Sequence, residues 1–153
     1  MYLNYTDLHR MYALLARIPE GLDPLRVRFE THVRKAGLGA IERIAQQEAV
    51  DPKTYVDALL EVHRKYNDLV RTAFSGESGF VAALDKACGE FVNRNKVSKN
   101  FTSKSPELLA RYCDSLLKKS AKNPEENELE DVMNSIVSRF FFLCVLDKKE
   151  IKQ

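Results

Sequence analysis

The sequence has 153 residues, of which 44% are hydrophobic and 30% are charged, and its 24 basic and 22 acidic side chains leave a formal net charge of +2. This size and composition are typical of one globular domain that buries a core. The near balance of charge gives no reason to expect a polyanionic partner, and no run of about 18 apolar residues is present to span a membrane.

The cysteines and the first residues of the chain indicate the compartment. Cys88, Cys113 and Cys144 are odd in number and widely spaced, a pattern that favours free thiols in a reducing compartment over a disulfide framework. The N-terminal residues lack the basic and apolar regions of a signal peptide. We therefore expect an intracellular protein, present in the cytoplasm and nucleus.

Apolar periodicity predicts the first two helices. Residues Thr6 to Ile18 place apolar side chains on one stripe, and a proline and a glycine follow. Asp23-Pro24 supplies a capping residue and a proline suited to a first turn, so it opens a long second helix. Gly37 and Gly39 each cost about 1 kcal/mol inside that helix, so we expect a bend or a close approach by a neighbouring helix. The apolar faces are Leu8, Met11, Tyr12, Leu15 and Ile18 in the first helix, and Leu25, Phe29, His32, Val33, Ala36, Ala40, Ile41 and Ile44 in the second.

Two more helices follow in the same manner. Asp51-Pro52 opens the third, whose apolar stripe ends at the turn sequence 75–79. The fourth begins at Phe80 and carries small residues that allow close helix contact. Residues 93–104 are polar, basic and without period, so we expect a loop there. The apolar faces are Tyr55, Leu59, Val62, Tyr66, Leu69, Val70 and Phe74 in the third helix, and Phe80, Ala83, Leu84, Ala87 and Phe91 in the fourth.

The C-terminal part of the sequence predicts a fifth and a sixth helix. Ser105 is a capping residue, Pro106 suits the first helical position, and Glu107 places negative charge where the helix dipole favours it. Asn123-Pro124 then starts a last helix that is acidic in its first turns. About six helices without a strand indicate an all-α fold, either a helical bundle or a stacked helical-repeat unit. The stripe of the fifth helix is Leu108, Leu109, Tyr112, Leu116 and Leu117.

No residue pattern predicts a catalytic, cofactor-binding or metal-binding site. His9, His32 and His63 are scattered over three predicted helices, and none lies four residues from another His or Cys, as a local metal motif requires. The acidic residues between Glu125 and Asp131 lie at a helix start, where the helix dipole alone explains them. We therefore expect no metal ion and no cofactor.

The cysteines and the basic residues likewise have ordinary explanations. Cys88 and Cys113 lie beside apolar stripes, so we interpret both as small buried hydrophobic residues rather than reactive thiols. One basic cluster has a single aromatic neighbour, Phe101, whereas a nucleic-acid site needs more charge and more stacking groups. We therefore expect no nucleic-acid partner. The cluster consists of Arg94, Lys96, Lys99 and Lys104.

Several strings of this sequence resemble the helical repeats of the cullins, the elongated scaffolds of multisubunit ubiquitin ligases. Residues 104–119, KSPELLARYCDSLLKK, closely resemble the third cullin repeat, and the similarity is greatest to the cullin of the SCF type. The resemblance extends from about Leu8 to Ile136. The other matching strings are GFVAALDKAC at 79–88, DPKTYV at 51–56, VHRKY at 62–66, LHRMYALLARI at 8–18 and FETHV at 29–33.

The resemblance implies a non-catalytic scaffold fragment built from cullin-repeat helices that stack end to end in a rigid stalk. Residues 1–21 would be the end of a preceding repeat, residues 22–138 one cullin repeat, and residues 139–153 a divergent tail. In the family, an N-terminal repeat binds the substrate-receptor adaptor, and a C-terminal region binds the RING subunit. We expect neither of these regions in this chain.

The tail is where the sequence departs from the family pattern. Residues 139–146 are almost wholly apolar, whereas a cullin continues here through an acidic, aromatic segment. Apolar side chains left in water favour self-association or capture of a partner. Two alternatives to the scaffold stay open: an independent helical module that binds another protein through residues 140–146, and an unrecognised enzyme. The residues expected to self-associate are Phe140, Phe141, Phe142 and Leu143.

Overall fold

The computed structural model describes residues 4–46, 49–95, 97 and 104–122. Its described residues contain no strand, so the all-α prediction is confirmed. The predicted sixth helix, which would start at Asn123, lies outside the described residues. Five helices are described: α1 (Tyr5–Leu15), α2 (Asp23–Ala45), α3 (Pro52–Ala73), α4 (Ser78–Asn93) and α5 (Lys104–Lys122).

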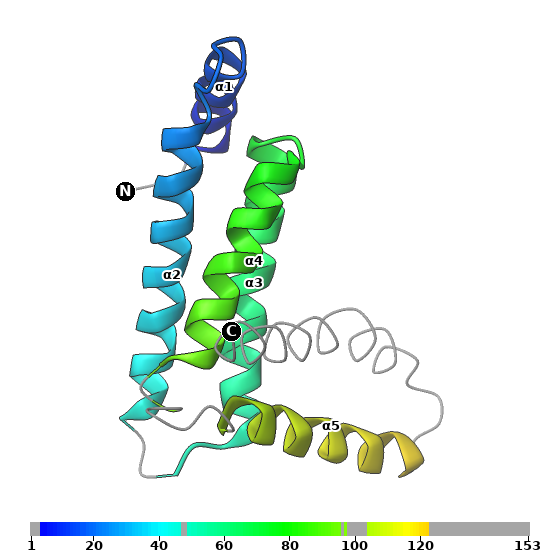
Figure 1. Cartoon of the computed structure of the whole chain (residues 1–153). Coiled ribbons are helices and arrows are strands. Elements are labelled where there is room, and N and C mark those ends of the chain that lie inside the picture. The colour runs from blue at the N-terminus through cyan, green and yellow to red at the C-terminus, as the bar shows by residue number, and fades with distance from the viewer. Residues whose placement is uncertain (1–3, 47–48, 96, 98–103, 123–153) are drawn as a thin grey trace, which may run out of the picture.

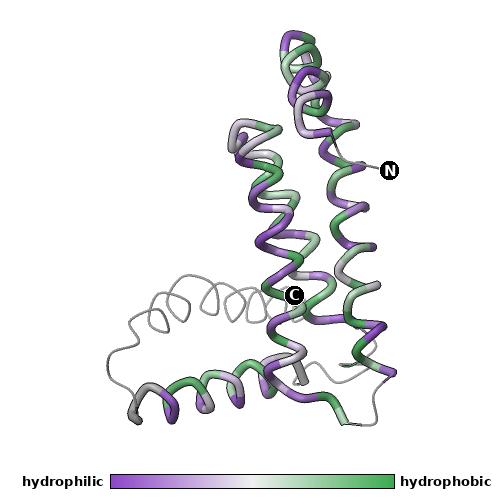
Figure 2. The backbone as a smooth tube through the Cα atoms, turned by 180° about the vertical axis from the view of Figure 1, so that it is seen from behind, coloured by the Kyte–Doolittle hydropathy of each residue, from purple (hydrophilic) through white to green (hydrophobic). Residues whose placement is uncertain are grey.

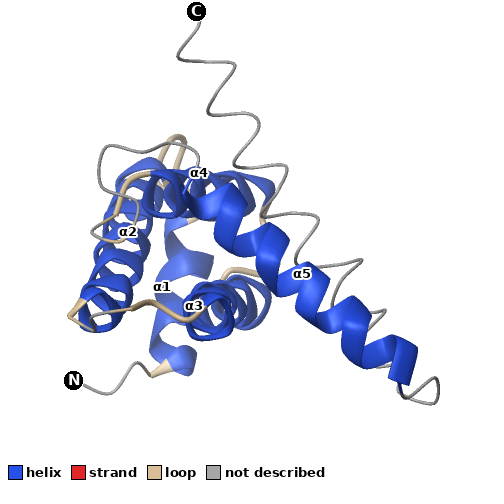
Figure 3. Ribbon diagram, turned by 90° about the horizontal axis from the view of Figure 1, so that it is seen from below, coloured by secondary structure: helices blue, strands red, loops and turns tan. Residues whose placement is uncertain are grey.

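Three long helices form the body of the molecule (Figure 1). α2, α3 and α4 run side by side, and α2 has its most extensive contacts with α4 and next with α3. α1 lies at one end of this bundle and packs on α3, while α5 contacts α3 at the opposite end. Figure 3 shows that α5 points away from the bundle rather than along it. The described chain is therefore a three-helix body with one helix attached at each end.

The starts of α2 and α3 follow the prolines, although neither aspartate makes the predicted capping hydrogen bond. Pro24 and Pro52 lie in the first turns, where a missing N–H costs no hydrogen bond. Asp23 is the first helical residue of α2 rather than its N-cap, and its carboxylate accepts a hydrogen bond from Arg26. Asp51 is the N-cap residue of α3, but its side chain makes no capping bond. The prolines therefore explain these starts better than the aspartates do.

α1 is shorter than predicted and is covered on one side only. It ends at Leu15 instead of Ile18, and the chain then turns toward α2 through Glu20, whose φ is 61°. None of its residues is fully buried, and Met11 and Ile18 are 40% and 57% exposed, contrary to the predicted buried stripe. Only the side that carries Leu8 and its neighbour Tyr12 packs against the core.

The limits of α4 and α5 also differ from the prediction. α4 begins at Ser78 instead of Phe80, because the Glu77 carboxylate accepts the N–H of Phe80 over 3.0 Å and caps the helix. α4 continues to Asn93. α5 begins one residue before the predicted cap Ser105. The predicted 93–104 loop is therefore too long at both ends.

One apolar cluster joins α2, α3, α4 and α5, and α1 packs at its edge. Figure 2 shows how apolar and polar residues alternate along each helix, as expected for amphipathic helices around a common core. Every predicted face residue of α4 is buried, and so are those of α3 except the partly exposed Val62. His32 and Leu117 were wrongly placed on buried faces, since both are exposed. Burying one Val, Leu or Phe side chain stabilises the fold by about 1.5–3 kcal/mol.

An aromatic cluster connects four helices near the α1 end of the bundle. Phe74 and Phe80 stack with ring centroids 4.1 Å apart, where α3 ends and α4 begins. Phe29 of α2 meets these two rings edge-on at 5.6 Å and 5.7 Å. Tyr12 of α1 contacts the same pair at 6.0 Å and 6.1 Å. The cluster is therefore the main apolar contact of α1 with the body.

The two glycines inside α2 have different environments. A Cβ atom on Gly37 would lie 2.5 Å from Cγ of the Phe91 ring of α4, so the predicted close approach is confirmed there. No heavy atom lies within 4 Å of the corresponding position on Gly39, so of the two glycines only Gly37 makes a close approach. The glycine at position 37 lets α2 and α4 pack closely, which agrees with their extensive contact.

Candidate functional site

The three histidines lie on three different helices in separate surroundings. His9 Nδ1 is 3.0 Å from the carbonyl oxygen of Ala73, at the C-terminal end of α3. His32 is exposed and its ring centroid lies 5.6 Å from that of Tyr66, whereas His63 is buried in α3. In the part of the chain that the structure describes, no three His, Cys, Asp or Glu side chains are grouped so that they could hold a metal ion.

The cysteines are placed in apolar surroundings. Cys88 is fully buried in α4, as predicted. Cys113 of α5 is only partly buried, and this burial raises the pKa of its thiol. A thiol with a raised pKa carries little thiolate at neutral pH and is a poor nucleophile. Cys144 lies outside the described residues.

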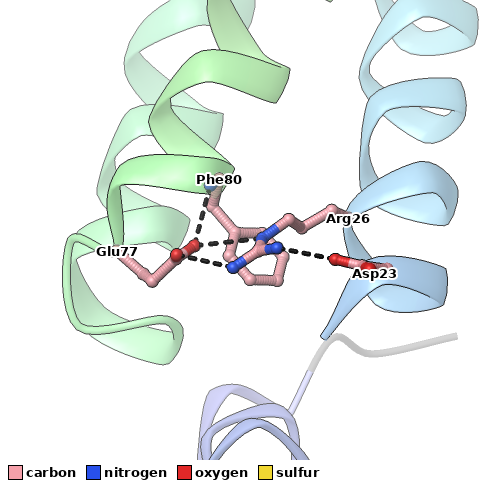
Figure 4. A network of polar contacts seen from close by, with 4 residues as sticks. All are labelled: Asp23, Arg26, Glu77 and Phe80. Atoms are coloured by element: carbon pink, nitrogen blue, oxygen red, sulfur yellow. Dashed lines mark hydrogen bonds and ion pairs between the residues drawn. The ribbon is translucent and has the colours of Figure 1, made fainter. Parts of the chain in front are cut away.

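A well-defined polar site joins the start of α2 to the start of α4 (Figure 4). Arg26 Nη2 donates to Glu77 Oε1 over 2.6 Å, and Arg26 Nε donates to Oε2 over 3.3 Å. The remaining Nη1 donates to Asp23 Oδ1 over 2.8 Å. Glu77 Oε2 also accepts the backbone N–H of Phe80. One carboxylate thus caps α4 and binds α2, and we call this arrangement the Arg26–Glu77 clamp.

The local sequence positions both partners of the clamp. Ser75 and Gly76 have positive φ angles of 51° and 66°, which reverse the chain between α3 and α4 and bring Glu77 to the N-cap position. Gly79 leaves room for the guanidinium group, because a Cβ atom there would lie 2.7 Å from Arg26 Cζ. A side chain at this position would therefore displace Arg26 from the carboxylate.

The clamp shifts the proton equilibria of both charged groups. Partial burial alone would raise the pKa of Glu77, but hydrogen bonds from Arg26 and from the N–H groups of Gly79 and Phe80 outweigh it, so the pKa lies below its usual value. The hydrogen bond to Glu77 is the main cause of the raised pKa of Arg26. The Arg26 Cζ atom also lies 5.8 Å from the centroid of the Phe80 ring, a cation–π contact. Both groups are therefore charged at neutral pH.

We expect the clamp to weaken as the solution is acidified. Because folding lowers the pKa of Glu77, its contribution to stability is complete above the unfolded-state pKa of about 4.3 and is lost as the pH falls through the lower folded-state pKa. Glu77→Gln should lower the free energy of unfolding by about 1–2 kcal/mol at pH 7 and by much less at pH 3. Urea unfolding at the two pH values measures this difference.

An exposed ion pair on α5 provides the control for this prediction. Asp114 accepts from Lys118 over 2.9 Å, and both side chains are mostly exposed. Asp114→Asn should therefore change the stability at pH 7 far less than Glu77→Gln does. Equal losses in the two variants, or a Glu77→Gln loss that persists at pH 3, would contradict the role of the clamp.

Further ion pairs tie α2 to α4 beyond the clamp. Arg34 Nη1 donates to Glu90 Oε2 over 2.8 Å, and Lys86 Nζ lies 3.3 Å from Glu30 Oε1. Partly exposed pairs of this kind contribute at most about 1 kcal/mol each. Together with the buried contacts, they fix the relative position of α2 and α4 along much of their length.

A groove of about 380 Å³ lies between α2 and α3. Small side chains, Ala36, Ala40 and Ala58, leave this space, and charged side chains such as Arg43 and Lys65 line it. Its lining contains no His, Cys or Ser. The groove offers van der Waals and charge contacts.

The remaining residues singled out in the sequence fall mostly outside the described part of the chain. Arg94 is exposed, and the side chains of the other members of its basic cluster are not described. The acidic segment 125–131 and the tail residues Phe140 to Leu143 are also outside it. The absence of a nucleic-acid partner and the self-association of the tail thus stay predictions. None of the described helices combines the length and the apolar character needed to cross a membrane.

Comparison with known proteins covers nearly the whole chain. Residues 1–149 match the family model of the cullin alpha solenoid domain, and this match extends past Ile136, where the resemblance noted in the sequence ends. Cullin-1 of Dictyostelium discoideum is 52% identical over 139 residues, which are 90% of this chain and 18% of that protein. Cullin-1 of Caenorhabditis elegans is 47% identical over 95% of this chain and 19% of that protein. Cullin-1 of Schizosaccharomyces pombe is 45% identical over 90% of this chain and 18% of that protein.

The helical architecture and the domain match define a segment of an α-helical solenoid. The chain belongs to the cullin family. It spans about a fifth of the length of the relatives that it matches. The resemblance stated from the sequence is therefore confirmed at the level of the family, and the assignment to the third repeat stays a prediction.

Proposed function

We propose that this chain is a non-catalytic scaffold segment of an SCF-type ubiquitin ligase, acting in the cytoplasm and nucleus. The observation that carries the proposal is its 45–52% identity to Cullin-1 of three organisms over at least 90% of the chain. A scaffold must keep its shape when its partners are bound. The Arg26–Glu77 clamp and the close contact at Gly37 supply such rigidity between α2 and α4.

We further propose that residues 1–21 are the end of one cullin repeat and that residues 22–138 form the next, the third of the stalk. Exposed apolar side chains at the α1 end support this arrangement, because stacked repeats bury such faces against their neighbours. Four side chains are far fewer than the roughly 20–30 residues that each partner contributes to a stable interface. A neighbour tethered in the same chain needs less area, since tethering raises its effective concentration. The exposed residues are Met11, Leu14, Ile18 and Val27.

The partners of the proposed ligase would bind elsewhere on a complete cullin. The adaptor-binding repeat and the RING-binding region of the family correspond to none of the resembling strings in this sequence. On this proposal, the isolated chain neither assembles a ligase nor stimulates ubiquitin transfer.

A chimera tests the scaffold function directly. The matching segment of Dictyostelium Cullin-1 is replaced by that of this chain, and ubiquitin transfer is reconstituted with the adaptor, the RING subunit and a substrate receptor. We expect the chimera to transfer ubiquitin at a rate similar to its parent, and the isolated chain to give none. A folded chimera that binds the adaptor and the RING subunit but no longer supports transfer would refute the proposal. So would transfer that depends on the isolated chain alone.

A self-associating interaction module is the second candidate, favoured by the apolar run at residues 140–146. Several apolar side chains that are exposed to water supply enough free energy for association when they become buried. We expect the full chain to be dimeric or aggregated at micromolar concentration, and a chain that ends after Ser138 to be more monomeric with its helices intact. Sedimentation and circular dichroism measure the two properties. A monomeric full chain, or a shortened chain that loses helicity, would exclude this candidate.

A further inference from the structure

Buried polar groups meet where α4 ends beside the first turn of α3. Tyr55 of α3 is fully buried, and Asn95, just after α4, is 8% exposed. Asn95 Nδ2 donates to the Tyr55 hydroxyl oxygen over 2.8 Å and to the carbonyl oxygen of Phe91 over 2.8 Å. The Tyr55 hydroxyl donates to the carbonyl oxygen of Val92 over 3.4 Å. We call this group of contacts the Tyr55–Asn95 junction.

The Asn95 side chain also holds the chain as it leaves α4. Its Oδ1 accepts the N–H of Val97 over 2.9 Å, while its Nδ2 reaches back to the last carbonyl groups of α4. The Asn95 amide therefore donates to carbonyl groups at the end of α4 and accepts a hydrogen bond from a backbone N–H beyond it. Aspartate would lack the donor and alanine would lack both donor and acceptor, so neither can replace this side chain in the same contacts.

The helix that carries Tyr55 is also the base on which α5 rests. α5 makes its most extensive helix contact with α3, through buried residues that include Leu108, Leu109 and Tyr112. Burial raises the pKa of Tyr112, and Asp57 of α3 raises it further. Asp57 lies two residues from Tyr55 in the first turns of α3. The junction and the contact surface for α5 thus lie at the same end of α3. Figures 1 and 3 show that α5 leaves the bundle from this end.

We propose that the Tyr55–Asn95 junction is an elbow that fixes the direction in which α5 leaves the bundle. Through Tyr55, Asn95 ties the end of α4 to the first turns of α3, the helix on which α5 packs. Asn95 and Tyr55 are positioning residues in this account. The inference that the junction orients α5 is drawn from the contacts alone. The inference that this orientation sets the path of a scaffold rests on the proposed function.

Distances between spin labels on α2 and α5 test the elbow in the full chain. Labels are attached at the exposed positions of Lys35→Cys and Lys118→Cys, with Cys113 and Cys144 changed to serine. Electron–electron double resonance then gives the distribution of distances between the two labels. We expect a narrow distribution in this background, and one roughly twofold wider or more when Asn95→Asp or Tyr55→Phe is added, because the end of α3 that carries α5 is then no longer tied to the end of α4.

A core variant separates orientation from stability. Ile41→Val removes a methylene from a fully buried side chain of α2 and leaves every hydrogen bond of the junction in place, so it should leave the distribution narrow. Tyr55→Phe keeps the ring and removes only the hydroxyl, and circular dichroism verifies that each variant retains its helices. A broad distribution in the unmodified background, no broadening in either junction variant, or equal broadening by Ile41→Val would overturn the elbow. None of these results depends on ubiquitin transfer, so the scaffold function is tested separately by the chimera.

Discussion

Replacing Gly37 by leucine is expected to destabilise the protein by about 3 kcal/mol, because the new side chain has no space in a filled core. Its Cβ atom alone would lie 2.5 Å from Cγ of Phe91, a ring that is fully buried between α2 and α4. The gain of roughly 0.5–1 kcal/mol from replacing glycine inside a helix is too small to offset this clash. Urea unfolding followed by circular dichroism measures the net loss.

Gly39 provides a control on the same helix. No heavy atom lies within 4 Å of the position that a Cβ atom would take there, so Gly39→Leu meets open space. The helix propensity then dominates, and we expect a small gain of up to about 1 kcal/mol. The two substitutions should therefore change the free energy of unfolding in opposite directions. A similar loss at both positions would show that the helix, rather than the contact with Phe91, responds to the change.

These glycines also show where the sequence stops being informative. Two glycines inside an apolar helical pattern predict a bend or a close approach by another helix, because they weaken the helix without an evident local reason. The pattern does not tell which glycine is in contact, since that depends on Phe91, a residue of another helix. The helices themselves could be predicted, because periodicity and prolines are local signals.

Burial at the α1 end shows the same limit. Spacing correctly placed Leu8 and Tyr12 toward the core, yet Met11 and Ile18 on the same predicted stripe are exposed. Periodicity identifies the apolar side of a helix, but only the presence of a neighbouring helix decides how much of that side is buried. The described residues cover one part of the stripe and leave the rest open.

The Arg26–Glu77 clamp could be predicted only in part. The turn sequence 75–79 just before an apolar run is a local signal for a helix start, but glutamate is not among the residues that usually cap one. Its ion pair with Arg26 joins residues far apart in the sequence, and many other acidic and basic residues could have been paired instead. The direction of α5 could not be predicted either, because it depends on contacts that buried α5 residues such as Leu108 and Tyr112 make with another helix, α3.

The family, in contrast, was evident from the strings, although the physical reasoning reached only an all-α bundle. Amphipathic periodicity is shared by unrelated helical proteins and does not distinguish among them. The order of particular residues in KSPELLARYCDSLLKK and GFVAALDKAC carries more information than their hydropathy. The cullin match over residues 1–149 confirms that inference, while the partners of the chain stay at the level of a proposal.

The largest loss of stability is expected from Phe80→Ala, at about 3–5 kcal/mol. Phe80 is fully buried and stacks on Phe74, and its ring also contacts Phe29 and Tyr12. Its removal leaves a cavity where four helices meet, and the flanking rings lose their contacts with it. Urea unfolding should show this loss, and Phe80→Leu, which keeps most of the apolar volume, should lose less.

The same substitution should release α1 before the rest of the protein unfolds. Tyr12 reaches the body through Phe74 and Phe80, and no residue of α1 is fully buried, so α1 depends on this aromatic cluster more than the other helices do. Hydrogen exchange should therefore accelerate in α1 of Phe80→Ala under conditions where α3 stays protected. Tyr5→Ala removes an exposed ring of the same helix and should change neither stability nor exchange by much. Exchange that accelerates equally in α1 and α3 would mean that the cluster supports the whole bundle alike and that α1 has no separate dependence on it.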